Sequence, residues 1–264
     1  MAASQQPRRA RLHARDAFYR QLLVLCLFLS VAMCLPPPAT QFSHVGFLLL
    51  TLLLAHGLAP RLNSSRGVYS RLTNRLYGYL AAFTIVIQVV WLLHPALITI
   101  SAPLLLAAYV LFIGWSLMRL LSSLSHERQI DSRLLSGATA GYLLLGLSGG
   151  LVLSVLESAM PGGFRDNITG HPLSLALPVG EASYPWDTDF ARLVYYAFVC
   201  LTTVGFGDIT PVTPLARLVS MSLSVMGPLY IAVVLGLLLA RFSSPDSSGS
   251  TAPPDPVEPA QEQR

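Results

Sequence analysis

The sequence predicts an all-α integral membrane protein with six transmembrane helices and a short re-entrant helix between the fifth and the sixth. Of its 264 residues, 53% are hydrophobic and 11% are charged, a composition typical of membrane proteins. Several apolar runs reach the length of about 20 residues that a helix needs to cross a bilayer. The segment 194–211, VYYAFVCLTTVGFGDITP, separates the last two runs with threonines, glycines and an aspartate.

Six apolar runs predict the transmembrane helices, and prolines or glycines separate most of them. These breakers lie at Pro36-Pro37-Pro38, Pro60, Pro95 and Pro161-Gly162-Gly163, where a helix ends or bends. The expected helices cover residues 17–35, 42–60, 76–93, 96–121, 134–158 and 213–241.

Two of these segments allow alternatives. The first run follows an arginine-rich start and also fits a signal peptide, whose cleavage would leave the remaining topology unchanged. Residues 61–76 form either an amphipathic helix on the inner leaflet or a solvated loop. The apolar side of such a helix would contain Leu62, Tyr69, Leu72 and Leu76.

The positions of the basic residues predict the orientation of the chain. All 17 are arginines, and they lie mainly at residues 8–20, 61–75 and 119–133, whereas the turns at 36–41 and 94–95 have none. Basic residues favour the cytoplasmic side, so both termini are expected in the cytoplasm of a multi-pass protein in the cell membrane. Because the arginines flank membrane-length segments, no nucleic-acid partner is expected.

The interrupted segment 194–211 contains backbone that cannot all be helical. Inside a bilayer such backbone is tolerated only where it is buried in protein or lines a watery cavity. Residues 189–202 are too few to cross and are expected to enter from the outside, with Asp187 and Asp189 as N-terminal capping acids. The C-terminal end of this helix has a partial negative charge that favours a cation at the membrane centre.

The residues after this short helix suit a ladder of main-chain carbonyl groups. A strand whose carbonyls all point to one axis alternates between ordinary and left-handed conformations, and glycine adopts the second without a Cβ penalty. Gly205 and Gly207 lie at that alternation. Rings of such carbonyls can replace the hydration shell of a cation, and the Thr203 hydroxyl would add one more ring.

This stretch closely resembles the pore signature of tetrameric potassium channels, in which a pore helix leads into T-V-G-[YF]-G-D. The aromatic pair Tyr195-Tyr196, the threonines Thr202-Thr203, the TVGFG filter and the following DITP occur together between two apolar helices. The resemblance covers the outer helix, pore loop and inner helix, and is to the prokaryotic type with four additional N-terminal helices. It implies a potassium-selective channel rather than an enzyme, with K⁺ as the permeant ion and no cofactor.

The resemblance implies a role for each residue of the filter. Main-chain carbonyls of Thr203, Val204, Gly205 and Phe206, together with the Thr203 hydroxyl, form successive K⁺ sites. Gly207 completes the outer mouth.

The same resemblance assigns supporting residues to the back of the filter. Asp208 anchors the filter, Tyr195 of the pore helix hydrogen-bonds to Asp208, and Tyr196 packs against Phe206. The sequence departs from the pattern of this family at two positions. Phe206 lacks the hydroxyl of the commoner tyrosine, and Val199 stands where some members have a glutamate that pairs with the aspartate.

Four regions and a fourfold assembly follow from this layout. They are a basic cytoplasmic N-terminus (1–20), a four-helix transmembrane region (17–125), a pore domain (131–242) and a disordered cytoplasmic tail (243–264). One pore loop cannot enclose an axis, so a homotetramer with cyclic symmetry in a lipid bilayer is expected.

Gly227 and Pro228 interrupt the sixth apolar run and predict either a gating hinge or a fixed kink. The fourth run has only Arg119, at its inner end, and therefore lacks the arginine series of a voltage sensor.

The outer segments contain several acidic residues. Glu157, near the end of the fifth run, is either a buried ionisable switch or a side chain that meets water at the headgroups. The long outer segment contains one basic residue, Arg165, and three acidic residues, Asp166, Glu181 and Asp187. This excess of acidic residues predicts either a mildly acidic mouth or an ordinary solvated loop.

Three competing functions are weaker. A weakly selective monovalent cation pore would require loss of a filter residue, yet residues 203–207 are intact. An intramembrane enzyme would need a serine with a histidine, or two acids, at membrane depth. A potassium transporter subunit would have four degenerate loops, and this chain has one.

Overall fold

The structure is a computed structural model that describes residues 6–33, 41–58, 68–93, 98–125, 132–173 and 188–242. In these ranges the chain forms α1 (Gln6–Ala32), α2 (Gln41–Leu58), α3 (Val68–Leu93), α4 (Ile98–Ser125), α5 (Ser132–Ala159), β1 (Phe164–Asp166), α6 (Thr188–Leu201), β2 (Ile209–Pro211) and α7 (Pro214–Phe242). The predicted tail 243–264 and the capping residue Asp187 lie outside the described residues.

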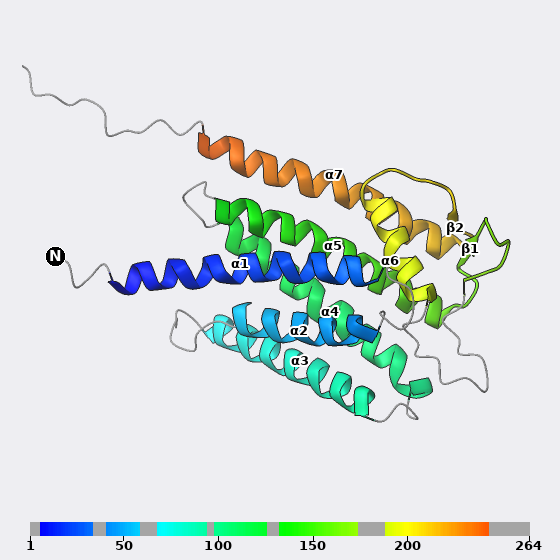
Figure 1. The fold of residues 1–264 in the computed structure, drawn as a ribbon, viewed down its shortest axis with the longest axis horizontal. Helices are drawn as coiled ribbons and strands as arrows, with labels where there is room; N and C mark the ends of the chain where they lie inside the picture. Colours follow the sequence, from blue (N-terminus) through cyan, green and yellow to red (C-terminus); the bar gives the residue numbers. More distant parts are fainter. Residues whose placement is uncertain are drawn as a thin grey trace, which may run out of the picture.

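The long helices lie side by side as a bundle (Figure 1). The start of α1 and the end of α7 lie at one end of the bundle, and α6 with the two strands lies at the other. By length and composition, three of the described helices can cross a membrane, over Ala107–Leu124, Leu134–Ala159 and Pro214–Gly236. The chain is therefore a mostly helical membrane protein, and the six crossings stay a prediction.

Local signals explain where the helices begin and end. The α7 helix begins with Pro214, whose missing N–H costs nothing at a first helical position. Thr213 precedes it as the N-cap, because its hydroxyl accepts a hydrogen bond from the Ala216 amide at 3.4 Å. Two helices begin well before the expected positions. The α1 helix begins at Gln6 rather than at residue 17. The α3 helix begins at Val68, so residues 68–76 are the first turns of a long helix and form no separate surface helix.

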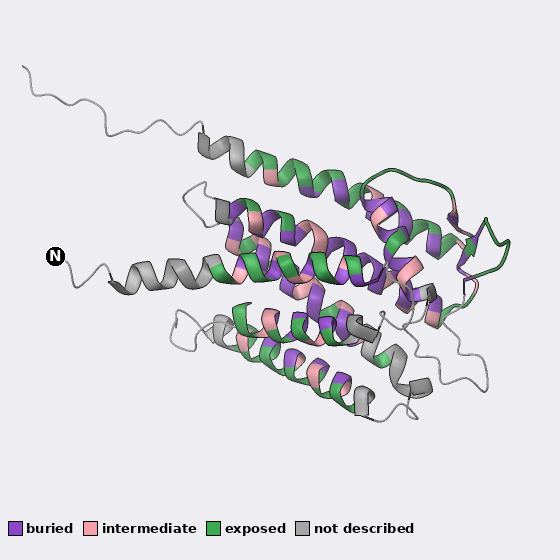
Figure 2. Cartoon of the chain, viewed as in Figure 1, coloured by how far each residue is buried: buried purple, intermediate pink, exposed green. Residues whose placement is uncertain are grey.

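The α5 helix is the centre of the bundle, since it contacts α1, α4, α6 and α7. Its apolar span is 61% buried, whereas that of α7 is 22% buried, and Figure 2 shows this contrast as mainly purple and mainly green ribbon. Glycines on α5 permit the close approach of α6. A Cβ at Gly150, for example, would lie 2.7 Å from Cα of Val194.

A small antiparallel sheet was not expected from the sequence. Strand β1 pairs with β2 in the register Phe164 with Pro211, Arg165 with Thr210 and Asp166 with Ile209. Phe164, Ile209 and Tyr196 belong to a second buried cluster beneath this sheet. The described chain is otherwise helical, as predicted, and these three-residue strands are too short to show an alternating pattern in the sequence.

Arg119 of α4 joins the end of α2 to the first turns of α3. Its guanidinium donates to the Leu58 carbonyl oxygen of α2 at 3.2 Å and to Asn74 Oδ1 of α3 at 2.9 Å. It also lies 4.2 Å from the centre of the Tyr77 ring. It is the only basic residue of α4 as described, and these contacts fit an anchor rather than a mobile charge.

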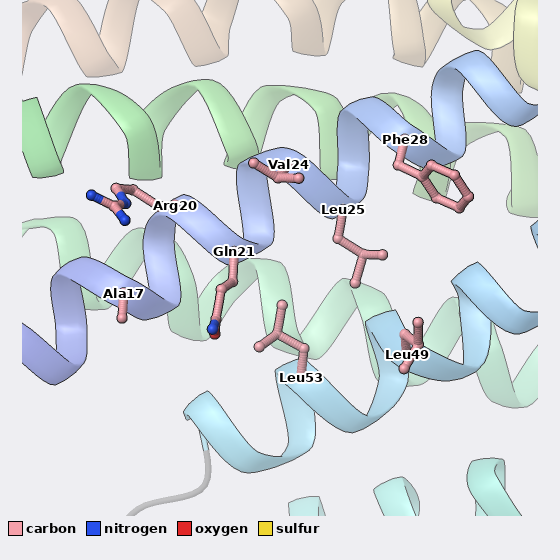
Figure 3. Close-up of a pocket in the computed structure, with 8 residues that line it drawn as sticks. All are labelled: Ala17, Arg20, Gln21, Val24, Leu25, Phe28, Leu49 and Leu53. Atoms are coloured by element: carbon pink, nitrogen blue, oxygen red, sulfur yellow. The ribbon is translucent and has the colours of Figure 1, made fainter.

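A groove of about 600 Å³ opens between α1 and α2 (Figure 3). Its lining is mainly apolar, with Arg20 and Gln21 toward one end. None of the lining residues belongs to α6, α7 or the segment between them.

Candidate functional site

The segment 202–208 leaves the end of α6 without helical structure and leads to β2 and then α7 (Figure 1). The α6 helix is placed by its apolar face, which buries Phe190, Leu193, Val194 and Ala197. Phe190 contacts Phe47 of α2 at a ring separation of 6.0 Å. The short helix thus packs against α2 and α5. It covers Thr188–Leu201, close to the expected range 189–202, and its entry into a membrane from the outside stays a prediction.

Hydrogen bonds fasten the segment to the last turn of α6. The amides of Thr202, Thr203 and Val204 donate to the carbonyl oxygens of Phe198, Cys200 and Val199, at 2.9, 3.0 and 3.1 Å. The Thr202 hydroxyl also donates to the Phe198 carbonyl oxygen at 2.7 Å. These bonds satisfy carbonyl groups that a helix end leaves open, and they fix the point at which the segment begins.

The backbone of the segment alternates in handedness. Thr203, Gly205 and Gly207 have φ values of 59°, 62° and 77°, in the left-handed region. The left-handed conformation predicted for both glycines is confirmed. Thr203 was not expected there, because a residue with a Cβ is strained at positive φ. The bond from its amide to Cys200 opposes this strain.

The segment and the adjoining helix expose apolar surface in a single chain. Val204 is 53% exposed and Phe206 is 68% exposed. On α7, Leu218, Met221 and Val225 are each more than half exposed. Large apolar side chains exposed in this number indicate contact with lipid or with another protein chain.

The structure places the supporting residues in two different surroundings. Tyr195 lies near the Asp208 carboxylate, and the hydrogen bond between them stays a prediction, while Oδ1 of Asp208 is buried without a hydrogen-bond partner among the described residues. Tyr196 is buried against Phe164, at a ring separation of 5.6 Å, and the described residues show no ring contact between it and the exposed Phe206. The predicted packing of these two rings therefore does not occur within one chain.

Asn167, which the sequence did not single out, contacts the C-terminal end of the segment 202–208. Its amide N–H donates to the Asp208 carbonyl oxygen at 2.7 Å, and its side-chain Nδ2 donates to the Gly207 carbonyl oxygen at 2.8 Å. Its Oδ1 accepts a hydrogen bond from the Thr210 hydroxyl at 3.3 Å. The partners are about 40 residues away in the chain, so no local pattern reveals them.

Asp166 forms an ion pair and does not contribute to an acidic mouth. It is 2% exposed and pairs with Arg192 of α6. Its carboxylate also accepts hydrogen bonds from the Thr169 hydroxyl and the Ile168 amide, each at 2.7 Å. These hydrogen bonds lower the pKa of Asp166 to about 2, and the bond from Thr169 has the largest effect. The predicted acidic mouth is wrong for this residue, and Glu181 and Asp187 lie outside the described part of the chain.

Glu157 is buried and caps the turn after α5. It is 1% exposed, and its two carboxylate oxygens accept hydrogen bonds from the amides of Gly162 and Gly163, at 2.6 and 2.9 Å. Because the Val212 amide in turn donates to the Gly163 carbonyl oxygen, this turn supports the chain between β2 and α7. The expectation that Glu157 meets water is wrong.

Gly227 lies where α7 touches the end of α6. A Cβ at this position would overlap the main-chain oxygen and carbon of Leu201, so close packing alone explains the glycine. Pro228 follows within α7, which is helical from Pro214 to Phe242. These two residues stay a predicted hinge.

The described residues contain no group of three or more His, Cys, Asp or Glu side chains that could bind a metal ion. The polar groups at the site are instead main-chain carbonyls, threonine hydroxyls and the side chains that support them. Such groups can coordinate an alkali cation.

A comparison with protein families supports this interpretation of the site. A family described as "Ion channel" matches residues 167–244, from Asn167 through α6, the segment and α7. The match supports a two-helix pore-loop ion channel module, and hence a channel rather than an enzyme. The searches of curated proteins and of solved structures gave no match.

Proposed function

We propose that the protein is a potassium-selective channel that conducts K⁺ passively through a filter made by residues 203–207 of four identical chains. The observation that carries the proposal is the alternation of left-handed backbone at Thr203, Gly205 and Gly207. Alternation of this kind lets successive carbonyl oxygens point toward one axis, where they can replace the water around a cation. The family match over residues 167–244 adds support for an ion channel.

The proposed K⁺ sites are formed by main-chain oxygens of Thr203, Val204, Gly205 and Phe206, with the Thr203 hydroxyl at the inner end and Gly207 at the mouth. In one chain residues 202–207 are all exposed, which suits groups that face an axis shared with other chains. Tyr195, Thr202, Val199 and Asp208 are proposed to support the filter from the same chain, and Tyr196 supports it from its buried position against Phe164.

The homotetramer is proposed because a single segment cannot surround an ion, and the exposed apolar faces of α7 and the filter give the chains surface to share. In the proposed topology α1 to α5 and α7 cross the cell membrane, and α6 dips in from the outside. Both termini then lie in the cytoplasm, as the arginine distribution favours.

The test is cation flux from proteoliposomes that contain the purified protein. A potassium gradient should drive cation flux, and barium should block this flux. A sodium gradient of the same size should drive little flux. Gly205→Ala should abolish this discrimination, because alanine is strained at a φ of 62° although a Cβ there meets no atom within 4 Å. Gly78→Ala in α3 is the matched control, since it also has open space around it and no positive φ.

Equal flux of sodium and potassium in the unaltered protein would favour the weakly selective cation pore. Equal selectivity in Gly205→Ala and Gly78→Ala would show that the backbone at residue 205 does not determine selectivity.

A further inference from the structure

We infer that Asn167 is an external positioning residue of the filter, which holds the outer mouth open to potassium and slows its closure. This inference rests on the proposed function. It names a residue from the segment before α6 as part of the conduction machinery, in addition to the filter and its internal supports.

Asn167 makes three hydrogen bonds to the chain that leaves the filter. Its Nδ2 donates to the Gly207 carbonyl oxygen at 2.8 Å, its backbone amide donates to the Asp208 carbonyl oxygen at 2.7 Å, and its Oδ1 accepts from the Thr210 hydroxyl at 3.3 Å. One residue thus fixes both the last filter residue and the strand that follows it.

The chemistry requires an amide side chain at this position. Asparagine has a donor and an acceptor at the end of a short side chain, and here the donor faces Gly207 while the acceptor faces Thr210. Aspartate has the same shape but no donor when ionised, so it would present a carboxylate oxygen to the Gly207 carbonyl oxygen. That substitution removes one bond with little change in volume.

Asn167 is itself held by the segment around it. Strand β1 ends one residue earlier and pairs with β2. Asp166, the neighbouring residue, pairs with Arg192 of α6 and accepts a hydrogen bond from Thr169. A continuous path of contacts therefore runs from the pore helix through Asp166 and Asn167 to Gly207.

The internal supports of the filter are incomplete in this chain, which gives the external contact more weight. Oδ1 of Asp208 is buried without a hydrogen-bond partner among the described residues. Val199, behind the filter, has no carboxyl group, and the exposed Phe206 has no hydroxyl group to bond to its surroundings. Asn167 is the side chain that bonds directly to the Gly207 carbonyl in the described structure.

A bound cation and Asn167 should stabilise the same open conformation. An ion that binds only the open mouth stabilises that conformation more as the ion concentration rises above its dissociation constant, by mass action. Loss of the Asn167 bond should therefore matter most at low external potassium and least at high external potassium. A general folding defect would lower flux at every concentration.

The experiment compares Asn167→Asp with Ile168→Ala, a neighbouring change at a side chain that is 81% exposed. Potassium currents are recorded from the full-length protein in planar bilayers over a series of external potassium concentrations. We expect Asn167→Asp to speed the decay of current at least about fivefold at low external potassium, since a hydrogen bond of this kind changes an equilibrium by roughly that factor. High external potassium should restore the slow decay, and Ile168→Ala should decay like the unaltered protein.

A second readout separates this inference from the proposed function. Hydrogen exchange of peptides that span residues 204–211 is measured in the purified protein, with Thr210→Val as a milder variant that removes only the 3.3 Å bond. Asn167→Asp should raise exchange there more than Thr210→Val does. The inference is overturned if the hydrogen exchange and the rate of current decay in Asn167→Asp match those in Ile168→Ala. It is also overturned if the faster decay in Asn167→Asp is independent of the external potassium concentration. Absence of potassium selectivity in the unaltered protein would instead reject the proposed function, and the exchange data would still test the contact.

Discussion

At the scale of single residues, the acidic side chains around the segment 202–208 bond to the chain itself. Glu157 caps the amides of Gly162 and Gly163, and Asp166 pairs with Arg192. Charge counting in the sequence treats both as groups that face solution. Their burial at 1% and 2% exposure is explained by these partners, because a buried carboxylate needs hydrogen bonds or an opposite charge.

The lowered pKa of Asp166 predicts how the stability of the outer end depends on pH. A carboxyl group whose pKa falls on folding stabilises the protein above its unfolded pKa and loses this effect as pH falls toward the folded value. For Asp166 the unfolded pKa is 3.8 and the folded pKa is about 2. The difference in thermal unfolding midpoint between the unaltered protein and Asp166→Asn should therefore be constant above about pH 4 and shrink toward pH 2. A difference that is the same at all these pH values would contradict the assignment.

At the scale of helices, contacts between elements give packing roles to the glycine of the predicted hinge and to the single arginine of α4. Gly227 permits α7 to touch the end of α6. Arg119 joins α4 to the ends of α2 and α3. Each residue has a packing role, which can be separated from a role in gating by suitable variants.

Substitutions in α7 distinguish packing from hinge motion. Gly227→Ala should lower the free energy of unfolding by about 1–3 kcal/mol, because the added methyl group overlaps the Leu201 backbone. Gly236→Ala is the control, since a Cβ there meets no atom within 4 Å. Thermal or denaturant unfolding in detergent measures both, and equal stability of the two variants would reject the packing explanation.

Pro228→Ala tests the hinge more directly, because Pro228 is exposed and alanine restores the missing backbone N–H. The hinge proposal predicts a changed open probability in single-channel records. Unchanged gating would leave a fixed kink or simple packing as the role of this pair.

Arg119→Gln should lower the free energy of unfolding by about 2 kcal/mol, since hydrogen bonds from a charged donor to two neighbouring helices are lost. Arg75→Gln changes the charge equally at an exposed position of α3 and is the matched control. Neither variant should alter the voltage dependence of the current. A large shift of voltage dependence in Arg119→Gln alone would identify it as a moving charge.

At the scale of the whole molecule, the sequence predicted features that depend on local patterns. Helix positions follow from the length of the apolar runs and from breakers such as Pro60 and Pro95, which come shortly after the ends of α2 and α3. The α5 and α7 helices likewise lie within two residues of the expected ranges 134–158 and 213–241. The left-handed backbone at Gly205 and Gly207 follows from the residue type.

Other features depend on contacts between distant residues and were missed. The β1–β2 sheet, the Asp166–Arg192 pair and the bonds of Asn167 all join the segment after α5 to α6 or to the end of the filter. The sequence 164–167 has no alternating pattern or motif that marks it as a partner of residues 207–211. Only the folded chain brings these segments together.

The central claim is that four copies of the segment 203–207 select potassium through their main-chain oxygens. The most direct measurement is the reversal potential of purified protein in a planar bilayer with potassium on one side and an equal concentration of sodium on the other. The account predicts that the reversal potential is displaced from zero by more than about 59 mV, with the sign expected when potassium is the more permeant ion. A displacement of this size corresponds to a tenfold preference for one monovalent ion over another. A reversal potential at zero would contradict it.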